Sequence, residues 1–385
     1  MTTPNLTQPL TESILTEIGC GTAAEAIMAV RYNTSLPGPT YIPSLDDALL
    51  HHRPHSACSS FRRGDLVELV GPSGCGKTSL ITFLLMTTLL PSSLSHPHEI
   101  SLGGKSSHAM IFQPATHLPI VPSLRKAMKA HVISCVPFAA NGVVEAVIKE
   151  SMSRLRVWRG KPRYKDIALG LRSVLNQISP FAHPDRHYHG GLDLLILDGL
   201  GDGYYPQRWA DEERGRKAPS VSGRIVGPED VGMRQVMEAI GMIRKDLGSV
   251  VVMSVQGLRT SRESNPFYLS HLPAPYPNPF LSNSVLPLNP QLPSNKANPT
   301  YWPLNIQLTL SGPARGLQLP GDITLVDALR ARDREEREKE KGEWMSERYE
   351  GFVRLTNKDN NTTDQNGTSF HFSIGEEGLQ VWGDS

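Results

Sequence analysis

The chain of 385 residues contains 39 lysines and arginines against 38 aspartates and glutamates, a formal net charge of +1, and 39% of its residues are apolar. This length and apolar content are enough for a full hydrophobic core, in one large domain with appendages or in two domains. The balanced charge excludes an overall electrostatic field that would attract polyanions, so any contact with nucleic acid must be local.

The cysteines and the amino terminus point to an intracellular protein. Four cysteines are far apart in the sequence and form no C-x-x-C pair: Cys20, Cys58, Cys75 and Cys135. We expect reduced thiols, as in the cytosol or nucleus. The first twenty residues lack the basic and apolar regions of a secretory signal. The longest nearly apolar run, 80–90, has eleven residues, too few to cross a bilayer.

The first predicted strand and helix follow a proline-containing amino-terminal segment. Residues 1–45 carry one weakly amphipathic stretch, and we expect an arm or linker there. The pattern "DLVELV" at 65–70 predicts a buried strand, and 77–90 predicts a helix ended by Pro91. These elements open the predicted core at 46–265.

Strand and helix patterns alternate through the rest of this core. Continuous apolar runs predict central strands, and apolar residues at helical spacing predict helices between them. The predicted strands are 108–113, 192–200 and 249–256, and the predicted helices are 122–133, 164–178, 232–248 and a helix or helix–turn–helix at 141–158. This alternation predicts an α/β fold with a mostly parallel twisted sheet flanked by helices.

The carboxy-terminal third begins with a change of composition. Residues 266–303 are predicted to form a long loop, because nine prolines between His271 and Pro303 leave no room for a strand or helix. Residues 304–385 are predicted to complete the core. The elements expected there are a strand at 304–312, a charged helical insertion at 325–350 and a closing antiparallel hairpin of 351–357 and 369–382.

The sequence "GPSGCGKTS" follows the first strand and fits the phosphate-binding pattern G-x-x-x-x-G-K-[ST]. Its glycines let successive amides face phosphate oxygens, and the amino end of the next helix adds positive potential. Lys77 would neutralise the β- and γ-phosphates of ATP, and Thr78 would bind Mg²⁺. The predicted nucleotide-binding residues are Gly71, Pro72, Ser73, Gly74, Cys75, Gly76, Lys77, Thr78 and Ser79. The alternatives are a glycine turn without ligand and a site that binds nucleotide without hydrolysing it.

Two polar residues end later predicted strands. Asp198 ends "LLILD" and is the candidate second group for Mg²⁺, a weak pattern by itself that gains weight downstream of a phosphate loop. Gln256 ends "VVVMSVQ" and is a candidate γ-phosphate sensor, with an ordinary strand-end side chain as the alternative. Arg259 and Arg262 follow in what would be a DNA-facing loop, although surface solubility also explains two arginines.

Two other classes of phosphate-loop protein fit less well. A transporter ATPase would carry a glutamate after the strand-ending aspartate, where this chain has Gly199, and its L-S-G-G-Q signature is missing before Asp198. A small kinase would need a compact arginine-bearing lid, and no such segment stands out.

Four segments in this order resemble the RecA-like family, and in particular the smallest eukaryotic paralogue of its recombinase: 64–91, 192–205, 234–258 and 370–382, which ends in "GEEGLQVW". The resemblance covers roughly residues 20–260 and the final hairpin. It implies a RecA-like P-loop core that binds ATP and Mg²⁺. It also implies a nuclear role in DNA double-strand break repair by homologous recombination. The implied setting is a hetero-oligomer of recombinase paralogues that acts on single-stranded or branched DNA.

One departure from the family concerns hydrolysis. In active members, the strand after the phosphate-loop helix delivers a glutamate that polarises the attacking water. This sequence aligns Ala115 at that position, near Gln113, and has no carboxylate between His108 and Lys126. Loss of a positioned base costs typically about 10² to 10⁴ in rate. We therefore expect weak or absent DNA-dependent ATPase activity.

Two rival hypotheses remain open from the sequence. One is an autonomous P-loop ATPase or kinase that uses another base, and the other is an architectural subunit with a vestigial nucleotide site. A metal site at His183, His187 and His189 has less support, because no cysteine or carboxylate cluster accompanies these histidines.

Overall fold

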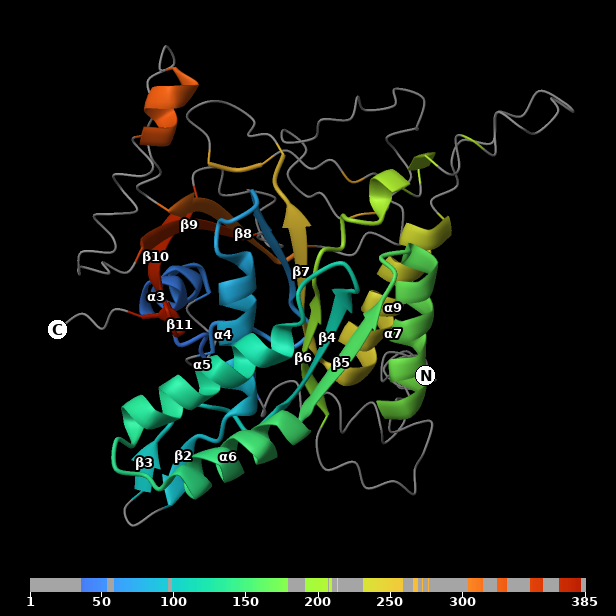
Figure 1. Ribbon diagram of the computed structural model, residues 1–385. Helices are drawn as coiled ribbons and strands as arrows, with labels where there is room; N and C mark the ends of the chain where they lie inside the picture. The colour runs from blue at the N-terminus through green and yellow to red at the C-terminus, as the bar shows by residue number, and fades with distance from the viewer. Residues whose placement is uncertain are drawn as a thin grey trace, which may run out of the picture. The chain divides into compact units, whose positions relative to one another are not determined.

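The structure is a computed structural model (Figure 1). It describes residues 36–53, 59–95, 99–178, 191–206, 208–209, 213, 231–258, 266–268, 272, 276, 304–313, 324–330, 347–355 and 367–381. The chain divides into two units, Met1–Leu36 and Pro37–Ser385, and of the first only Leu36 is described. The fold below is that of the second unit.

The described strands form a nine-stranded sheet in the order β11-β10-β9-β8-β1-β7-β6-β4-β5. Six neighbouring strands are parallel: β8 (Ile306–Pro313), β1 (Leu66–Gly71), β7 (Val250–Gln256), β6 (Leu192–Leu197), β4 (His108–Pro114) and β5 (Leu155–Gly160). Three strands continue the sheet in antiparallel pairing: β9 (Glu347–Leu355), β10 (Thr368–Gly375) and β11 (Gly378–Gln380). A separate small hairpin joins β2 (Ser93–Ser95) to β3 (Glu99–Ser101).

Helices cover both faces of this sheet (Figure 1). One face carries α4 (Lys77–Leu89), α5 (Ile120–Cys135) and α6 (Asn141–Ser153), and the other carries α7 (Tyr164–Ile178) and α9 (Val231–Leu247). The short helix α3 (Pro43–His52) packs against β9 and β10. Each face has its own hydrophobic core, because successive strand residues point to opposite sides. Leu194 and Ile196 of β6 lie in the α4 core, and Leu195 lies in the α7 core.

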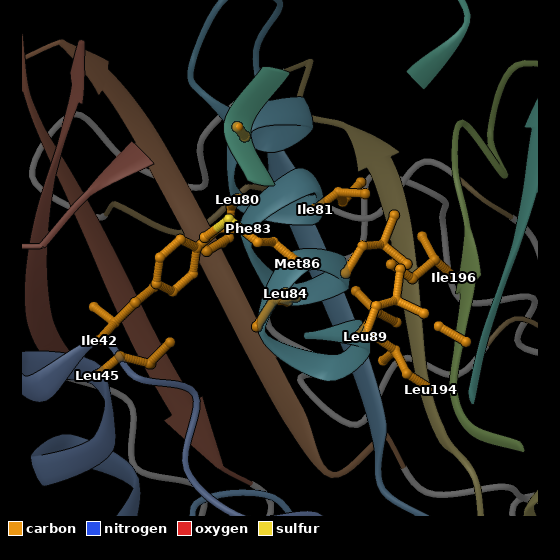
Figure 2. Close-up of a cluster of buried hydrophobic side chains, with 14 of the residues drawn as sticks. Ile42, Leu45, Leu80, Ile81, Phe83, Leu84, Met86, Leu89, Leu194 and Ile196 are labelled. Carbon is orange, nitrogen blue, oxygen red and sulfur yellow. The ribbon is translucent and has the colours of Figure 1, made fainter. Parts of the chain in front are cut away.

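Helix α4 lies at the centre of its core. Every residue from Leu80 to Leu89 is buried, so the helix lacks the polar face of a surface helix. Figure 2 shows it between Ile42 and Leu45 on one side and Leu194 and Ile196 on the other. The helix that starts at the phosphate loop is therefore fixed by packing along its length.

The α/β class, the mostly parallel sheet between helices and the carboxy-terminal antiparallel hairpin are confirmed. Two boundaries differ from the prediction. The stretch 141–158 is not all helical, because α6 ends at Ser153 and β5 follows. The charged insertion at 325–350 has helix at 325–330, but β9 begins at Glu347. β5 was missed because it is a half-buried edge strand whose arginines resemble the polar face of a helix.

Part of the proline-rich segment is anchored to the core. Phe267, Leu272 and Tyr276 are buried there, within the range predicted to be a loop. Among the residues that the structure describes, no helix has both the length and the apolar character needed to span a membrane.

Candidate nucleotide-binding site

The glycine-rich loop joins the carboxyl end of β1 to the amino end of α4, as the sequence predicted. Gly74 and Gly76 have φ of 79° and 89°, the left-handed region that side chains disfavour. A Cβ at Gly76 would also lie 2.9 Å from Cδ1 of Ile374, because the carboxy-terminal hairpin packs over the loop. Ser73 and Gly74 are exposed, so the loop opens to solvent at the amino end of α4. Backbone amides at such a helix end favour an anion.

Lys77 folds back onto its own loop. Its Nζ donates hydrogen bonds to the carbonyl oxygens of Gly71 and Pro72, both at 2.6 Å, and lies 3.7 Å from Sγ of Cys75. Burial raises the pKa of the Cys75 thiol more than the neighbouring Lys77 lowers it, so the thiol is neutral. A phosphate that binds here must draw the ammonium group away from these two carbonyls.

Thr78 and Ser79 stand at the edge of a cavity of about 690 Å³ between α4, α5 and the carboxy-terminal hairpin. The Thr78 side chain is exposed. The polar residues around the cavity include Thr78, Ser79, Thr82, Ser123, Lys126, His131, Glu376 and Gln380. The cavity therefore gives a ligand held by the loop room to extend along α4.

Asp198 follows β6 directly and is 9% exposed. Its Oδ1 accepts a hydrogen bond from Oγ of Ser254 at 2.8 Å. Its Oδ2 lies 2.9 Å from Nδ1 of His117 and 3.4 Å from Nε2 of Gln113. Burial alone would raise the pKa of Asp198, but the hydrogen bonds from His117 and Ser254 outweigh it and lower the pKa. Asp198 is therefore a buried, ionised carboxylate held by donors from two neighbouring strands and one loop.

His117 is the functional-site residue that sequence reasoning missed. Its Nε2 lies 2.7 Å from Oδ2 of Asp202, so the ring bridges two carboxylates. The hydrogen bonds to Asp198 and Asp202 raise the pKa of His117 to about 10, against the opposing effect of burial. Nη2 of Arg159 holds the same loop by donating to the carbonyl oxygens of Ala115 and His117. A signal was present, since His117 is the only ionisable side chain between His108 and Arg125.

Gly199 leaves room for this bridge. Its φ is 63°, and a Cβ there would lie 2.5 Å from Oδ2 of Asp202 and 2.8 Å from Cε1 of His117. A glutamate at this position, as in a transporter ATPase, would collide with both side chains. The position of the His117 ring therefore requires a residue without a side chain at position 199.

Gln256 lies beside the start of the phosphate loop. In the parallel pairing of β1 with β7 it stands opposite Gly71, and the next amide, of Gly257, donates to the Gly71 carbonyl oxygen at 2.8 Å. Because β7 lies between β1 and β6, the loop, Gln256 and Asp198 end three successive strands. At about 4.8 Å per strand, β1 and β6 are roughly 10 Å apart. These three predicted features therefore meet at one edge of the sheet.

The other predicted residues divide into two groups. Ala115, which the resemblance aligns with the glutamate of active members, lies in the turn after β4, and its amide donates to the carbonyl oxygen of Gly160. The remaining candidates lie outside the described residues: Arg259, Arg262, His183, His187 and His189.

Thr78 and Asp198 match the way in which proteins bind Mg²⁺ more closely than they match a site where protein side chains supply all the metal ligands. In the described ranges no group of three or more His, Cys, Asp or Glu side chains is placed to hold a metal ion. Mg²⁺ usually keeps several waters and takes one or two protein oxygens together with substrate phosphates. The exposed hydroxyl of Thr78 and the ionised carboxylate of Asp198 are oxygen ligands of this kind, and both oxygens of Asp198 are hydrogen-bonded to Ser254 and His117 in this structure.

No protein-family model matches the chain, and no curated protein sequence matches it. Its function is therefore inferred from the geometry of this edge of the sheet and from the resemblance carried by the sequence.

Proposed function

We propose that this chain is an ATP-binding subunit of the RecA-like family, a recombinase paralogue that acts in DNA double-strand break repair by homologous recombination. It would join other paralogues in a nuclear complex that helps to load the recombinase on single-stranded DNA. The observation that carries the proposal is the succession of phosphate loop, Gln256 and Asp198 on β1, β7 and β6. These are the three positions that the resemblance assigns to the phosphate loop, the γ-phosphate sensor and the magnesium carboxylate of a RecA-like core.

The nucleotide would bind across the amino end of α4. The loop amides and Lys77 would hold the phosphates, and Thr78 and Asp198 would hold Mg²⁺, which neutralises phosphate charge when bound. The nucleoside would lie in the cavity beside Thr78 and Ser79. Gln256, next to Gly71, would face the terminal phosphate.

The proposed subunit binds ATP and hydrolyses it slowly or not at all. Ala115 supplies no base, and both ring nitrogens of His117 are engaged by Asp198 and Asp202. Neither nitrogen is therefore available to accept a proton from water. Bound ATP would act by stabilising the folded core and its interface with a partner through linkage.

Nucleotide binding is tested by titrating a fluorescent ATP analogue with Mg²⁺ into the purified chain and into Lys77→Ala. We expect Lys77→Ala to weaken binding about 10- to 150-fold, the value of one charge-assisted hydrogen bond. Lys149→Ala, an exposed lysine on α6, is the matched control and should bind as the parent does. Absence of binding by the parent protein would refute the ATP-binding part of the proposal.

The partner class is tested by affinity capture from cells with damaged DNA, followed by identification of the proteins that co-purify. Recovery of recombinase paralogues, increased by ATP, is the expected result. If the isolated chain instead turned over ATP at steady state and lost this activity in Lys77→Ala, the autonomous ATPase or kinase hypothesis would replace the proposal.

One observation favours an architectural subunit as a second candidate. Lys77 and Asp198 are already satisfied by protein groups, so the site is internally complete without a ligand. In that case Lys77→Ala would leave both capture of partners and repair in cells unchanged.

A further inference from the structure

Lys105, in the loop between β3 and β4, has a side chain that is partly buried but still within reach of solvent. Its Nζ lies 5.8 Å from the ring centre of Tyr41, and its Cε would lie 3.6 Å from a Cβ added to Gly38. Within the part of the chain that the structure describes, Nζ makes no hydrogen bond or ion pair. Burial of an ammonium group without an acceptor is costly, so this position favours the neutral amine.

Two carboxylates are near enough to affect Lys105, but other donors already hold them. The two oxygens of Asp46 accept hydrogen bonds from the backbone amides of residues 40–41, at 2.8 and 3.0 Å. Oδ1 of Asp193 accepts one from Nη1 of Arg63 at 2.8 Å. Burial lowers the pKa of Lys105 to about 8, against the opposing effect of Asp46 and Asp193. About a tenth of the Lys105 amines are therefore neutral at pH 7, against roughly one in three thousand for an ordinary lysine.

The backbone on both sides of this lysine is fixed and strained. The Ser106 amide donates to the carbonyl oxygen of Leu90 at 2.8 Å. The Gly104 amide donates to that of Pro91 at 3.2 Å. Among the described residues, only Tyr41 and Ser106 combine a side chain with a positive φ, at 65° and 51°. One adjoins the lysine in sequence and the other lies under its ammonium group, and strain of this kind gathers at functional sites.

We propose that Lys105 is an acylation site, where the side-chain amine takes the acyl group of a small thioester. Nζ attacks the thioester carbonyl carbon, a C–N bond forms as the C–S bond breaks, and the nitrogen proton passes to the departing thiolate. The products are a neutral amide and a free thiol. A carbamate formed with CO₂ fits less well, because it would add a negative charge near Asp46 and Asp193.

The modification would alter one wall of the cavity beside the glycine-rich loop. Tyr41 and Gly103 line this cavity. Acylation removes the positive charge over the Tyr41 ring, and with it the cation–π attraction. The amide of Tyr41 still donates to Asp46, so the backbone of this wall should stay in place. The inference goes beyond nucleotide binding and does not depend on it.

Reactivity is tested by incubating the full chain with acetyl-coenzyme A and measuring the acetylation rate of each lysine by peptide mass spectrometry. At pH 7 we expect Lys105 to react about 10-fold faster than the exposed Lys149 of α6. A neutral fraction roughly 300-fold above that of an ordinary lysine should outweigh the lower basicity and partial burial of Lys105. Its rate should level off above about pH 8, whereas that of a lysine model peptide should keep rising. Lys105→Arg should abolish the Lys105 signal and leave the rate at Lys149 unchanged.

Two variants of Tyr41 distinguish a reactive environment from simple access. Tyr41→Ala should raise the pH at which the Lys105 rate levels off, because water then reaches the ammonium group. Tyr41→Phe keeps the ring and should leave that pH unchanged. Thermal unfolding checks that both variants are folded. Acetyl phosphate replaces the thioester in a parallel reaction, and faster acetylation of Lys105 by acetyl phosphate would overturn the thioester as donor.

Three results would overturn the site itself. They are equal acetylation rates for Lys105 and Lys149 at pH 7, a Lys105 rate that rises without levelling off through about pH 9, and the same levelling pH in Tyr41→Ala as in the parent. The first two are measured on the parent protein, so they decide the proposal even if Tyr41→Ala fails to fold.

Discussion

Two buried carboxylates, one in the middle of a strand and one just past the end of another, differ in the direction of their pKa shifts. Glu68, in the middle of β1, is 5% exposed, and Asp198, just past the end of β6, is 9% exposed. The hydroxyl of Tyr276 donates to Oε1 of Glu68 at 2.6 Å, and Nε2 of Gln307 donates to Oε2. Asp198 also has several donors, so neither burial nor the presence of hydrogen bonds distinguishes the two groups.

The direction of the pKa shift does distinguish them. For Glu68, burial outweighs the hydrogen bonds from Tyr276 and Gln307 and raises the pKa. For Asp198, the bonds from His117 and Ser254 outweigh burial and lower the pKa. The difference lies in the partners, because Asp198 accepts a hydrogen bond from the charged His117, whereas the donors to Glu68 are the neutral side chains of Tyr276 and Gln307. A charged partner thus separates the ionised acid at the end of β6 from the acid inside β1.

A closed polar cluster surrounds Glu68. Nε of Arg354 donates to Oε1 of Gln307 at 2.5 Å, and the Arg354 guanidinium lies 4.0 Å from the ring centre of Phe267. Burial lowers the pKa of Arg354 to about 9, against the opposing effect of Glu68. The cluster therefore ties β1, β8 and β9 to two anchors from the proline-rich segment, Phe267 and Tyr276.

The largest expected effect comes from breaking this cluster. Glu68→Ala should lower the free energy of unfolding by about 3 to 5 kcal/mol, because it leaves two buried donors, the Tyr276 hydroxyl and the Gln307 amide, without their acceptor, at roughly 1 to 3 kcal/mol each. Glu68→Gln, which keeps an acceptor for Tyr276, should cost less. Denaturant unfolding measures both, and a loss below about 1 kcal/mol for Glu68→Ala would show that the cluster is not what stabilises this part of the sheet.

Removal of the second carboxylate should have a smaller effect on stability and a larger one on ligand binding. We expect Asp198→Ala to cost about 1 to 3 kcal/mol of unfolding free energy, since it removes hydrogen bonds at the edge of the sheet. The added affinity for an ATP analogue that Mg²⁺ provides should be lost. Titrations of the ATP analogue in the presence of Mg²⁺ and in the presence of a chelator measure this added affinity. If Mg²⁺ increased the affinity of Asp198→Ala as much as that of the parent, Asp198 would not be part of the site.

Substitution of two glycines would compare the glycine-rich loop, where an added Cβ meets no atom, with the end of β6, where it meets His117 and Asp202. Gly74→Ala should cost about 1 kcal/mol, from its left-handed φ alone, because no atom lies within 4 Å of the added Cβ. Gly199→Ala should cost about 2 kcal/mol or more, because the Cβ also displaces His117 and Asp202. Equal costs in thermal or denaturant unfolding would mean that the His117 bridge gives way easily.

The smallest expected effect is a dependence of stability on alkaline pH. The pKa of His117 is raised from 6.5 to about 10, so its contribution is complete below pH 6.5 and is lost as pH rises through about 10. The effect should be modest, since the side chain is 34% exposed. Thermal midpoints between these pH values should fall more for the parent than for His117→Asn. Parallel pH curves would show that His117 is not charged in the bridge.

Asp198 stabilises the fold with the opposite pH dependence, because its pKa is lowered in the folded state. This contribution is complete above the ordinary pKa of an aspartate and is lost as pH falls through the lowered pKa of the folded state.

Much of the fold was predictable because each central strand leaves a recognisable pattern in a short stretch of sequence. β1, β6 and β7 are mostly apolar and largely buried on both faces, with Glu68 as the polar exception inside β1, and these patterns predicted the strands directly. β5 was not predictable in this way, because none of its residues is fully buried and its two arginines, three positions apart, suited one face of a helix equally well. The burial of Tyr276 inside a proline-rich segment depends on Glu68, which is 208 residues away in the chain.

The glycine-rich loop was determined by the sequence itself, since its glycines, Lys77 and Thr78 lie within nine consecutive residues between a strand and a helix. The partners of Asp198 were decided only by tertiary structure. His117 is 81 residues from it in the chain, and the parallel pairing of β4 with β6 brings the two together. Backbone dihedrals and helix ends are local properties, whereas the surroundings of a carboxylate depend on which strands become neighbours.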